Sequence, residues 1–377
     1  MKKNHRGGAC APPVSAKRTY RENFGPVAYA LFAALTLVTL VACVCIGSVN
    51  IPAGETAAVI AAAAKEVTRA IFDKSITVAD AVGAVVPQSA WAAIILTVRL
   101  PRVLAVALVG AALSLGGAAM QGLLKNPLAD GSTLGVSSGA SLGAVIAIAF
   151  NITMPGLPFG ATTVMAILFA FLSLILILSL AYKLDYSLAT NTIILIGVIF
   201  SMFVSSVLSL IITMAPHKVQ SITFWTMGSL SGASYSDVLV LLAALVVCGA
   251  FVGLRARELN AFAIGEDNAR HIGVDVKQVK LVIMIAVSAL IGVCVSVGGT
   301  IGFVGLVVPH MVRMITGPNH RRLLPACVFG GAAFLMLCDL TARILLNPLE
   351  LPIGVVTSFI GAILFVVIFY QSRRARK

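Results

Sequence analysis

The chain consists of long apolar runs separated by short polar segments. A bilayer core about 30 Å thick needs about 20 consecutive apolar residues in a helix, and the first two such runs are Val27 to Val49 and Val103 to Leu124. The others lie at about 132–150, 161–182, 190–214, 238–254, 281–297, 303–315, 323–346 and 353–370. This pattern predicts an all-α polytopic membrane protein with about ten transmembrane helices.

One run is ambiguous in length. Leu281 to Met311 contains no Asp, Glu, Lys or Arg and has "GGTIG" near its middle. Lys and Arg accumulate on the cytoplasmic side of a membrane, and ten crossings with an inside N-terminus place 20 of the 27 basic residues there. A single crossing would move several basic residues and the C-terminal tail outside. We therefore predict a turn at Gly298-Gly299 and two cytoplasmic termini.

Composition supports a lipid environment. The chain is 59% hydrophobic and 11% charged, with a mean hydropathy of +1.02, too few polar groups to cover a soluble protein of this size. The formal net charge is +13. Its basic residues are scattered over loops without interleaved aromatic residues, so we expect contact with anionic lipid and no nucleic acid partner.

The domain organisation is simple. We expect a basic cytoplasmic tail at 1–26, one membrane domain at 27–370 and a second basic tail at 371–377. The outer loop 50–90 contains "AAVIAAAAKEVTRAIFDK", which is typical of an amphipathic surface helix. Six of the seven cysteines lie inside apolar runs, so we expect them to pack there and to form neither a disulfide nor a metal site.

Charge is concentrated in residues 255–280, which hold nine of the 41 charged residues. Within this segment, "GEDNARHIG" has Glu266 and Asp267 in a first helical turn, Arg270 and His271 in a last turn, and Gly273 as a terminator. A helix this short is marginal alone in water. Either a partner holds it, or the segment is a solvated loop that folds back on the membrane.

Three arginines break the charge rule on the outer side. Arg99 and Arg102 lie in "RLPR", and Arg343 follows Asp339 by four residues. Facing outward, the three would form a dock for an acidic protein surface. The alternatives are contact with lipid phosphate and, for Arg343, pairing with Asp339.

Small residues recur at helical spacing in two runs. One stripe is Gly131, Gly135, Gly139 and Gly143, which favours close helix packing. The other is Ser201, Ser205 and Ser209. The serine stripe is compatible with a polar path or, in preference, with helix packing.

The sequence contains few motifs that could support catalysis or bind a cofactor. There is no H-E-x-x-H metal motif and no phosphate-binding loop for ATP, so we expect no catalytic residue, no metal and no cofactor on this chain. A serine hydrolase built from "SSGAS" at 137–141 and His310 is a weaker interpretation than packing. An ion-coupled secondary transporter usually carries more intramembrane ionisable groups than Asp339, Arg343 and His310, but it remains the main alternative class.

Four blocks carry a family resemblance. They are "RLPRVLAVALVGAALSLGGAAMQGLLKNPLADGSTLGVSSGA", "AIGEDNARHIGV", "GTIGFVGLVVPHMVRMITGPNHRRLLP" and "ELPIGVVTSFIGAILF". The chain resembles, over about residues 90–370, the permease subunit of the ABC importers for ferric siderophores, haem and vitamin B12, the iron-complex or type II importer family. The resemblance implies a homodimer with a substrate path on its two-fold axis, two ATPase subunits that bind ATP and Mg, and an extracytoplasmic binding protein. A ferric siderophore is the expected cargo, with vitamin B12 and haem left open.

The resemblance also assigns residues. It implies an ATPase coupling helix that includes Gly265, Glu266, Asp267, Ala269, Arg270 and Gly273. It implies binding-protein docking by Arg99, Arg102 and Arg343. It implies a cytoplasmic gate formed by Asn126, Pro127, Leu128, Thr190 and Asn191. The last two stand where the vitamin B12 permease has Thr and Ser, so we expect a gate of different size and polarity.

Overall fold

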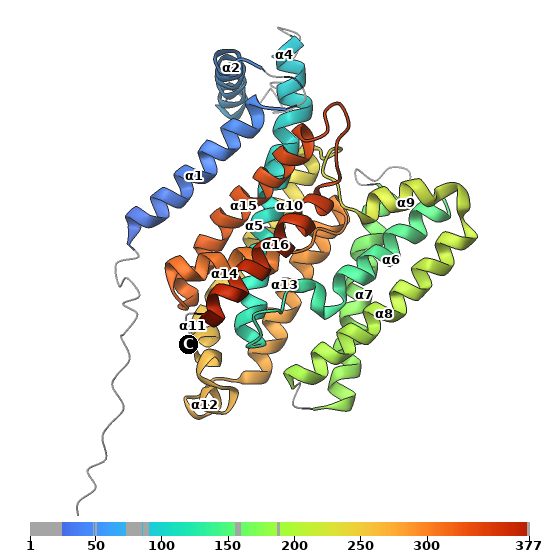
Figure 1. The fold of residues 1–377 in the computed structure, drawn as a ribbon, viewed down its shortest axis with the longest axis vertical. Coiled ribbons are helices and arrows are strands. Elements are labelled where there is room, and N and C mark those ends of the chain that lie inside the picture. The colour runs from blue at the N-terminus through green and yellow to red at the C-terminus, as the bar shows by residue number, and fades with distance from the viewer. Residues whose placement is uncertain are drawn as a thin grey trace, which may run out of the picture.

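A computed structural model describes residues 25–374 apart from 48, 50, 73–84, 86–89, 155–159 and 187–188. Within these residues the chain forms helices packed side by side, and no strand is present (Figure 1). The basic tail before residue 25 and the last three residues lie outside the described part, so their predicted roles stay predictions.

Ten apolar helices confirm the predicted membrane architecture. Seven are long and apolar enough to span a bilayer: α1 (Pro26–Cys45), the continuous helix Trp91–Leu123 that ends in α5 (Leu100–Leu123), α7 (Ala161–Leu184), α8 (Thr190–Met214), α10 (Tyr235–Leu254), α13 (Val276–Gly298) and α15 (His320–Ile344). Three more are apolar but shorter over their apolar parts: α6 (Val136–Ala149), α14 (Val304–Thr316) and α16 (Ile353–Arg374).

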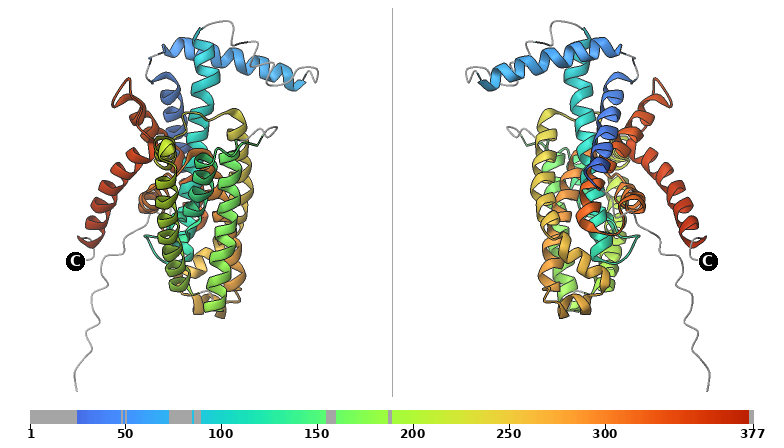
Figure 2. Two further views of the ribbon diagram at one scale, coloured as in Figure 1. Left: turned by 90° about the vertical axis from the view of Figure 1, so that its right-hand side faces the viewer. Right: turned by 90° about the vertical axis from the view of Figure 1, so that its left-hand side faces the viewer.

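Short elements connect these spans. On the outer side they are α2 (Ala53–Phe72), η4 (Pro216–Lys218) and α9 (Val219–Thr226), while α4 (Ala90–Ala93) forms the first turn of the second span. On the inner side they are η3 (Gly131–Leu134), α11 (Ala256–Ile264) and α12 (Glu266–His271). α2 lies across one end of the molecule and confirms the predicted surface helix (Figure 2). α1 begins and α16 ends toward the opposite end, which carries α12 (Figure 1).

The second span is longer than the sequence predicts. It begins at Trp91 rather than Val103, because the helix continues through "RLPR" instead of starting there. Pro101 has no N–H to donate to the preceding turn, and the helix widens into the π-helical segment η2 (Ile94–Arg99) just before it. Arg99 and Arg102 are thereby carried inside the folded chain.

α5 is the central helix, and glycines bring its neighbours close. A Cβ atom on Gly110 would lie 2.3 Å from the carbonyl oxygen of Gly331 in α15. A Cβ on Gly117 would lie 1.9 Å from the carbonyl oxygen of Gly305 in α14. Both distances are shorter than any real Cβ contact, so only glycine allows these backbones to meet.

A side chain of α5 also supplies a hydrogen bond that α14 lacks. Pro309 cannot donate to the carbonyl oxygen of Gly305. Nε2 of Gln121 in α5 donates instead to the carbonyl oxygens of Gly305 and Leu306, at 3.3 and 3.1 Å. A buried carbonyl that would otherwise lack a donor is thus satisfied from the neighbouring helix.

The predicted turn between α13 and α14 is confirmed. α13 ends at Gly298, and Gly299 has a φ of 68°, which is unfavourable for any residue with a Cβ. A Cβ there would also lie 2.2 Å from the carbonyl oxygen of Trp225. Two of the four glycines in the predicted stripe lie on α6, where a Cβ on Gly139 or Gly143 would collide with α7. The other two do not continue that helix, since Gly131 lies in η3 and Gly135 precedes α6 with a φ of 74°.

Candidate functional site

Two of the three outer arginines, Arg102 and Arg343, pair with carboxylates, and Arg99 lies beside Arg343. We call Arg99, Arg102, Arg343, Asp339 and Glu350 the outer arginine cluster. Arg102 donates from Nε and Nη2 to Oδ1 of Asp339 at 3.1 and 3.0 Å, and from Nη1 to Oε2 of Glu350 at 2.8 Å. Nε of Arg343 lies 3.0 Å from Oδ2 of Asp339, an ion pair whose angle is outside the hydrogen-bonding range. Asp339 is only 1% exposed, so α5 and α15 are joined by paired, desolvated charges.

Two of these arginines also cap the C-terminal end of α1. Arg99 donates to the carbonyl oxygens of Val44, Cys45 and Val49, and Arg343 donates to those of two neighbouring residues, Cys43 and Ile46. The last carbonyls of a helix have no intrahelical donor and form the negative end of its dipole. Guanidinium groups are therefore well matched to this helix end.

The prediction that the three arginines face outward is wrong. Arg99, Arg102 and Arg343 are 6%, 7% and 3% exposed, because acceptors from distant parts of the chain surround them. The alternative pairing of Arg343 with Asp339 is confirmed. The most open member of the outer arginine cluster is Glu350, whose side chain is 37% exposed. A role of the arginines in docking stays a proposal.

At the opposite end, α12 has the form that the sequence predicts. Glu266 and Asp267 occupy its first turn, and Arg270 and His271 its last. Gly265 precedes it with a φ of 138°. Gly273 follows it with a φ of 86°, and its N–H donates to the carbonyl oxygen of Arg270. The helix is therefore bounded by two glycines in conformations that other residues rarely adopt.

Glu266 connects α12 to two membrane helices. Its carboxylate accepts from Nζ of Lys280, which is completely buried in α13, with the closest approach at 2.8 Å. It also accepts from the hydroxyl of Thr190, the first residue of α8, at 3.3 Å. A carboxylate is favourable at this helix N-terminus. The sequence singled out Glu266 and Thr190 separately, and the structure brings them together.

The other gate segment approaches α12 from α5. Oδ1 of Asn126 accepts from the backbone N–H of Leu128 and shapes a turn in which Pro127 and Leu128 are exposed. Lys125, which precedes this turn, lies beside α12. It lines a hollow of about 600 Å³ together with Ala189 and five residues around α12: Gly265, Glu266, Asp267, Asn268 and Arg270.

The entry to α8 is held by a second carboxylate. Oδ2 of Asp185 accepts from the N–H of Ala189 at 3.1 Å and from the hydroxyl of Thr192 at 3.4 Å, while Asn191 is exposed. Next to it, hydrogen bonding with Tyr182 and the proximity of Lys277 lower the pKa of Tyr186. The sequence does not predict the role of Lys280, because its contact with Glu266 depends on how α12 packs on α13. Asp185 could have been found from the sequence, because its two partners lie only four and seven residues ahead of it.

A hydroxyl-lined pocket of about 320 Å³ lies between α6, α8, α9 and the turn after α13. Its polar lining residues are Ser137, Ser138, Ser141, Ser205, Thr226 and Thr300. In the serine stripe, Ser201 accepts a hydrogen bond from Ser138, whereas Ser205 and Ser209 are exposed. These two serines therefore do not pack against another helix in the described part of the chain, and the polar path stays a proposal. His310 is not among the lining residues, so nothing in the described part assembles the serine hydrolase alternative.

The chain is similar to a known transport family and to several permease proteins. The FecCD transport family matches residues 35–371. The uncharacterized ABC transporter permease protein YvrB of Bacillus subtilis is 44% identical over 281 residues, covering 74% of this chain and 80% of that protein. The hemin transport system permease protein HmuU of Yersinia pestis is 37% identical over 285 residues, covering 74% and 84%.

Two further similarities agree with these. The cobalamin import system permease protein BtuC of Halobacterium salinarum is 38% identical over 280 residues, covering 74% of each chain. A solved structure described as an inward-facing conformation of a metal-chelate type ABC transporter superposes with a TM-score of 0.76 at 29% identity. That match covers 92% of this chain and 100% of the other.

Proposed function

The chain belongs to the FecCD transport family of ABC importer permeases, and from this premise we propose that it carries a ferric siderophore into the cytoplasm. As a multi-pass protein of the inner membrane, it supplies the conduit. ATP and Mg bind to two separate ATPase subunits, and an extracytoplasmic binding protein delivers the cargo.

The choice of cargo rests on a shared chemical class. Relatives are named for cobalamin and hemin, and the similar structure for a metal chelate. All three cargoes are organic complexes of a metal ion. A ferric siderophore fits this class, and vitamin B12 and haem are the competing cargoes.

The contact between Thr190 and Glu266 carries the proposed mechanism. When ATP closes the ATPases, α12 moves with the ATPase surface on which it sits. Glu266 passes this movement to the start of α8 through Thr190 and to α13 through Lys280. α8 then changes the opening between the gate segments, which is alternating access by displacement of packed helices. No covalent bond changes on this chain.

A second copy of the chain completes the conduit in this proposal. α16 stands away from the other helices (Figure 2), and its Phe359 and Val366 are 71% and 66% exposed. α8 exposes Met202 and Phe203, at 67% and 63%. Faces of this kind suit a homodimer, with the hydroxyl-bearing side of α8 turned toward the shared path.

Docking of the binding protein takes place at the outer arginine cluster in this proposal. Arg102 is held by Glu350, which is partly exposed. An acidic side chain of the binding protein can take the place of Glu350, because the two carboxylates compete for the same guanidinium. Arg99 and Arg343 act indirectly by fixing α1 beside the docking surface.

Competitive uptake tests the cargo. Cells with and without this chain receive labelled ferric siderophore in the presence of unlabelled ferric siderophore, haem or cobalamin. We expect chain-dependent uptake that unlabelled ferric siderophore alone abolishes. Inhibition by cobalamin or haem, or uptake independent of the chain, would reassign the cargo.

A further inference from the structure

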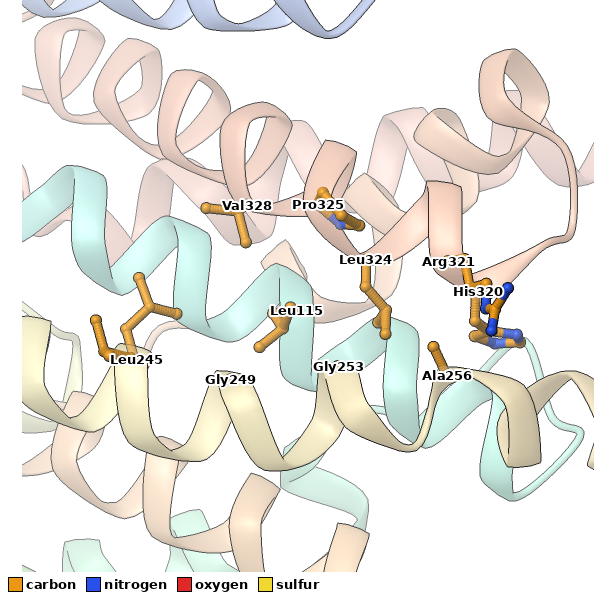
Figure 3. Close-up of a pocket in the computed structure, with 11 residues that line it drawn as sticks. Leu115, Leu245, Gly249, Gly253, Ala256, His320, Arg321, Leu324, Pro325 and Val328 are labelled. Carbon is orange, nitrogen blue, oxygen red and sulfur yellow. The ribbon is translucent and has the colours of Figure 1, made fainter. Parts of the chain in front are cut away.

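An apolar groove of about 390 Å³ runs between α10 and α15 on the side of the chain away from α8 (Figure 3). Leu115 of α5 forms its floor. Its walls are Leu245, Val246, Gly249 and Gly253 of α10 and Leu324, Pro325 and Val328 of α15. The groove follows the direction of the helices, which is the direction of lipid acyl chains.

The groove is open because two residues of α10 on this side are glycines, which have no side chain to fill it. Both α10 and α15 pack on α5, which leaves a channel above it. A Cβ atom on Gly253 would meet no atom within 4 Å, and one on Gly249 would make ordinary contacts with Leu115 at 3.4 Å and Leu245 at 3.9 Å. No side chain of the described residues fills the space over Gly253.

One end of the groove is cationic. Arg321 and His320 lie there, opposite Ala256 (Figure 3). Arg321 is exposed, and its guanidinium makes no ion pair or hydrogen bond with the part of the chain that the structure describes. His320 is 3% exposed and its Nε2 lacks a hydrogen-bond partner. This end is the cytoplasmic one, because α10 continues there into α11 and α12.

We propose that this groove binds one anionic phospholipid of the inner leaflet. An acyl chain lies over Gly249 and Gly253, and the phosphate lies at Arg321. The arrangement matches the two parts of a lipid, because the apolar stretch lies within the hydrocarbon region and the unpaired cation lies at headgroup depth. A second copy of the chain would instead need an acidic residue at this point.

Such a lipid connects helices that lead to the two ends of the molecule. α10 leads directly into the segment that carries α12, and α15 holds Asp339 of the outer arginine cluster. A lipid seated in the groove contacts both helices where they do not pack on each other closely. This inference goes beyond the proposed function and does not depend on the cargo.

Lipid retention tests the proposal. The permease complex is placed in nanodiscs with equal phosphatidylglycerol and phosphatidylcholine, extracted in detergent, and its bound lipids are counted by native mass spectrometry. We expect the wild type to retain phosphatidylglycerol preferentially. Arg321→Gln should lower that preference about fivefold, the usual contribution of one basic residue near an anionic membrane surface. Gly253→Leu should remove the retained lipid of either type.

Lys218→Gln is the matched control, because it removes one partly exposed positive charge at the outer end of the molecule. It should leave retention unchanged. Equal retention in wild type, Arg321→Gln and Gly253→Leu would overturn the proposal. Loss of the dimer in Gly253→Leu with unchanged lipid would also overturn it and assign the groove to a second copy. Arg321→Gln should fold because Arg321 is exposed, so it tests the proposal even if Gly253→Leu does not fold.

Discussion

The hydroxyl of Thr190 donates to Oε1 of Glu266 at 3.3 Å, across 76 residues of sequence. This bond joins the first residue of α8 to the first residue of α12. It is a direct contact between α12, the proposed ATPase contact, and a proposed gate residue, because no intermediate side chain is needed.

Thr190→Val removes this bond at nearly constant volume. Hydrogen bonds to charged groups contribute about 1.5–3 kcal/mol, so we expect cargo transported per ATP hydrolysed to fall by about tenfold or more in proteoliposomes. Thr213→Val is the control, because its hydroxyl donates within the same helix to the carbonyl oxygen of Ser209. Equal ratios in the two variants would contradict the route through Thr190.

Glu266→Gln should uncouple transport and also destabilise the protein. It removes the carboxylate that pairs with the buried ammonium of Lys280, and removing one partner of a buried pair costs about 3–5 kcal/mol. Glu55→Gln, which removes an exposed carboxylate from the outer helix α2, should have little effect on either. Thermal unfolding and coupled ATPase assays measure both quantities.

The double variant Glu266→Gln, Lys280→Met separates the two effects. It removes the buried ammonium together with its carboxylate partner, so the melting temperature should return toward that of the wild type. The transport ratio should stay low, because the link from α12 to α13 is still missing. Recovery of transport together with stability would mean that the ion pair is only structural.

Docking should respond in opposite directions to two changes in the outer arginine cluster. Arg102→Gln removes the proposed anchor and should weaken binding-protein affinity by about tenfold or more. Glu350→Gln releases Arg102 from a partly exposed partner and should strengthen affinity by about twofold to fivefold. Titration of reconstituted permease with labelled binding protein measures both. Affinity changes of the same sign would exclude exchange of carboxylates on Arg102.

Gly117→Ala should destabilise the chain strongly. The added methyl would meet the backbone of Gly305 in α14, which cannot rotate away as a side chain can. Overpacking of this kind costs about 1–3 kcal/mol or more. Gly232→Ala is the control, because a Cβ there meets no atom within 4 Å. Thermal unfolding in detergent should distinguish the two, and equal melting temperatures would contradict the close packing of α5 on α14.

Local patterns explain what the sequence predicts well. Apolar runs, the charge rule and Gly298-Gly299 together predict the helices and the turn between α13 and α14. The capping residues of "GEDNARHIG" predict α12. In each case the physical cause lies within a few residues or in the membrane itself.

The features that the sequence predicts badly depend on partners that lie far away in the chain. Arg102 looks like an outer-surface residue until Asp339, 237 residues away, is placed beside it. The sequence does not predict α9, because its eight residues are too few for a span and no side chain caps it. The α5 span was placed too short, because "RLPR" resembles a helix start whose charges are exposed. The link from Glu266 to Thr190 likewise depends on which helices become neighbours.

The central claim is that this chain is a conduit driven by a separate ATPase through α12. Reconstitution into liposomes tests it most directly, with labelled ferric siderophore and binding protein on one side and ATP on the side of α12. We predict uptake only when the ATPase subunits and ATP are both present. Uptake by the purified chain alone, driven by an ion gradient, would contradict the account.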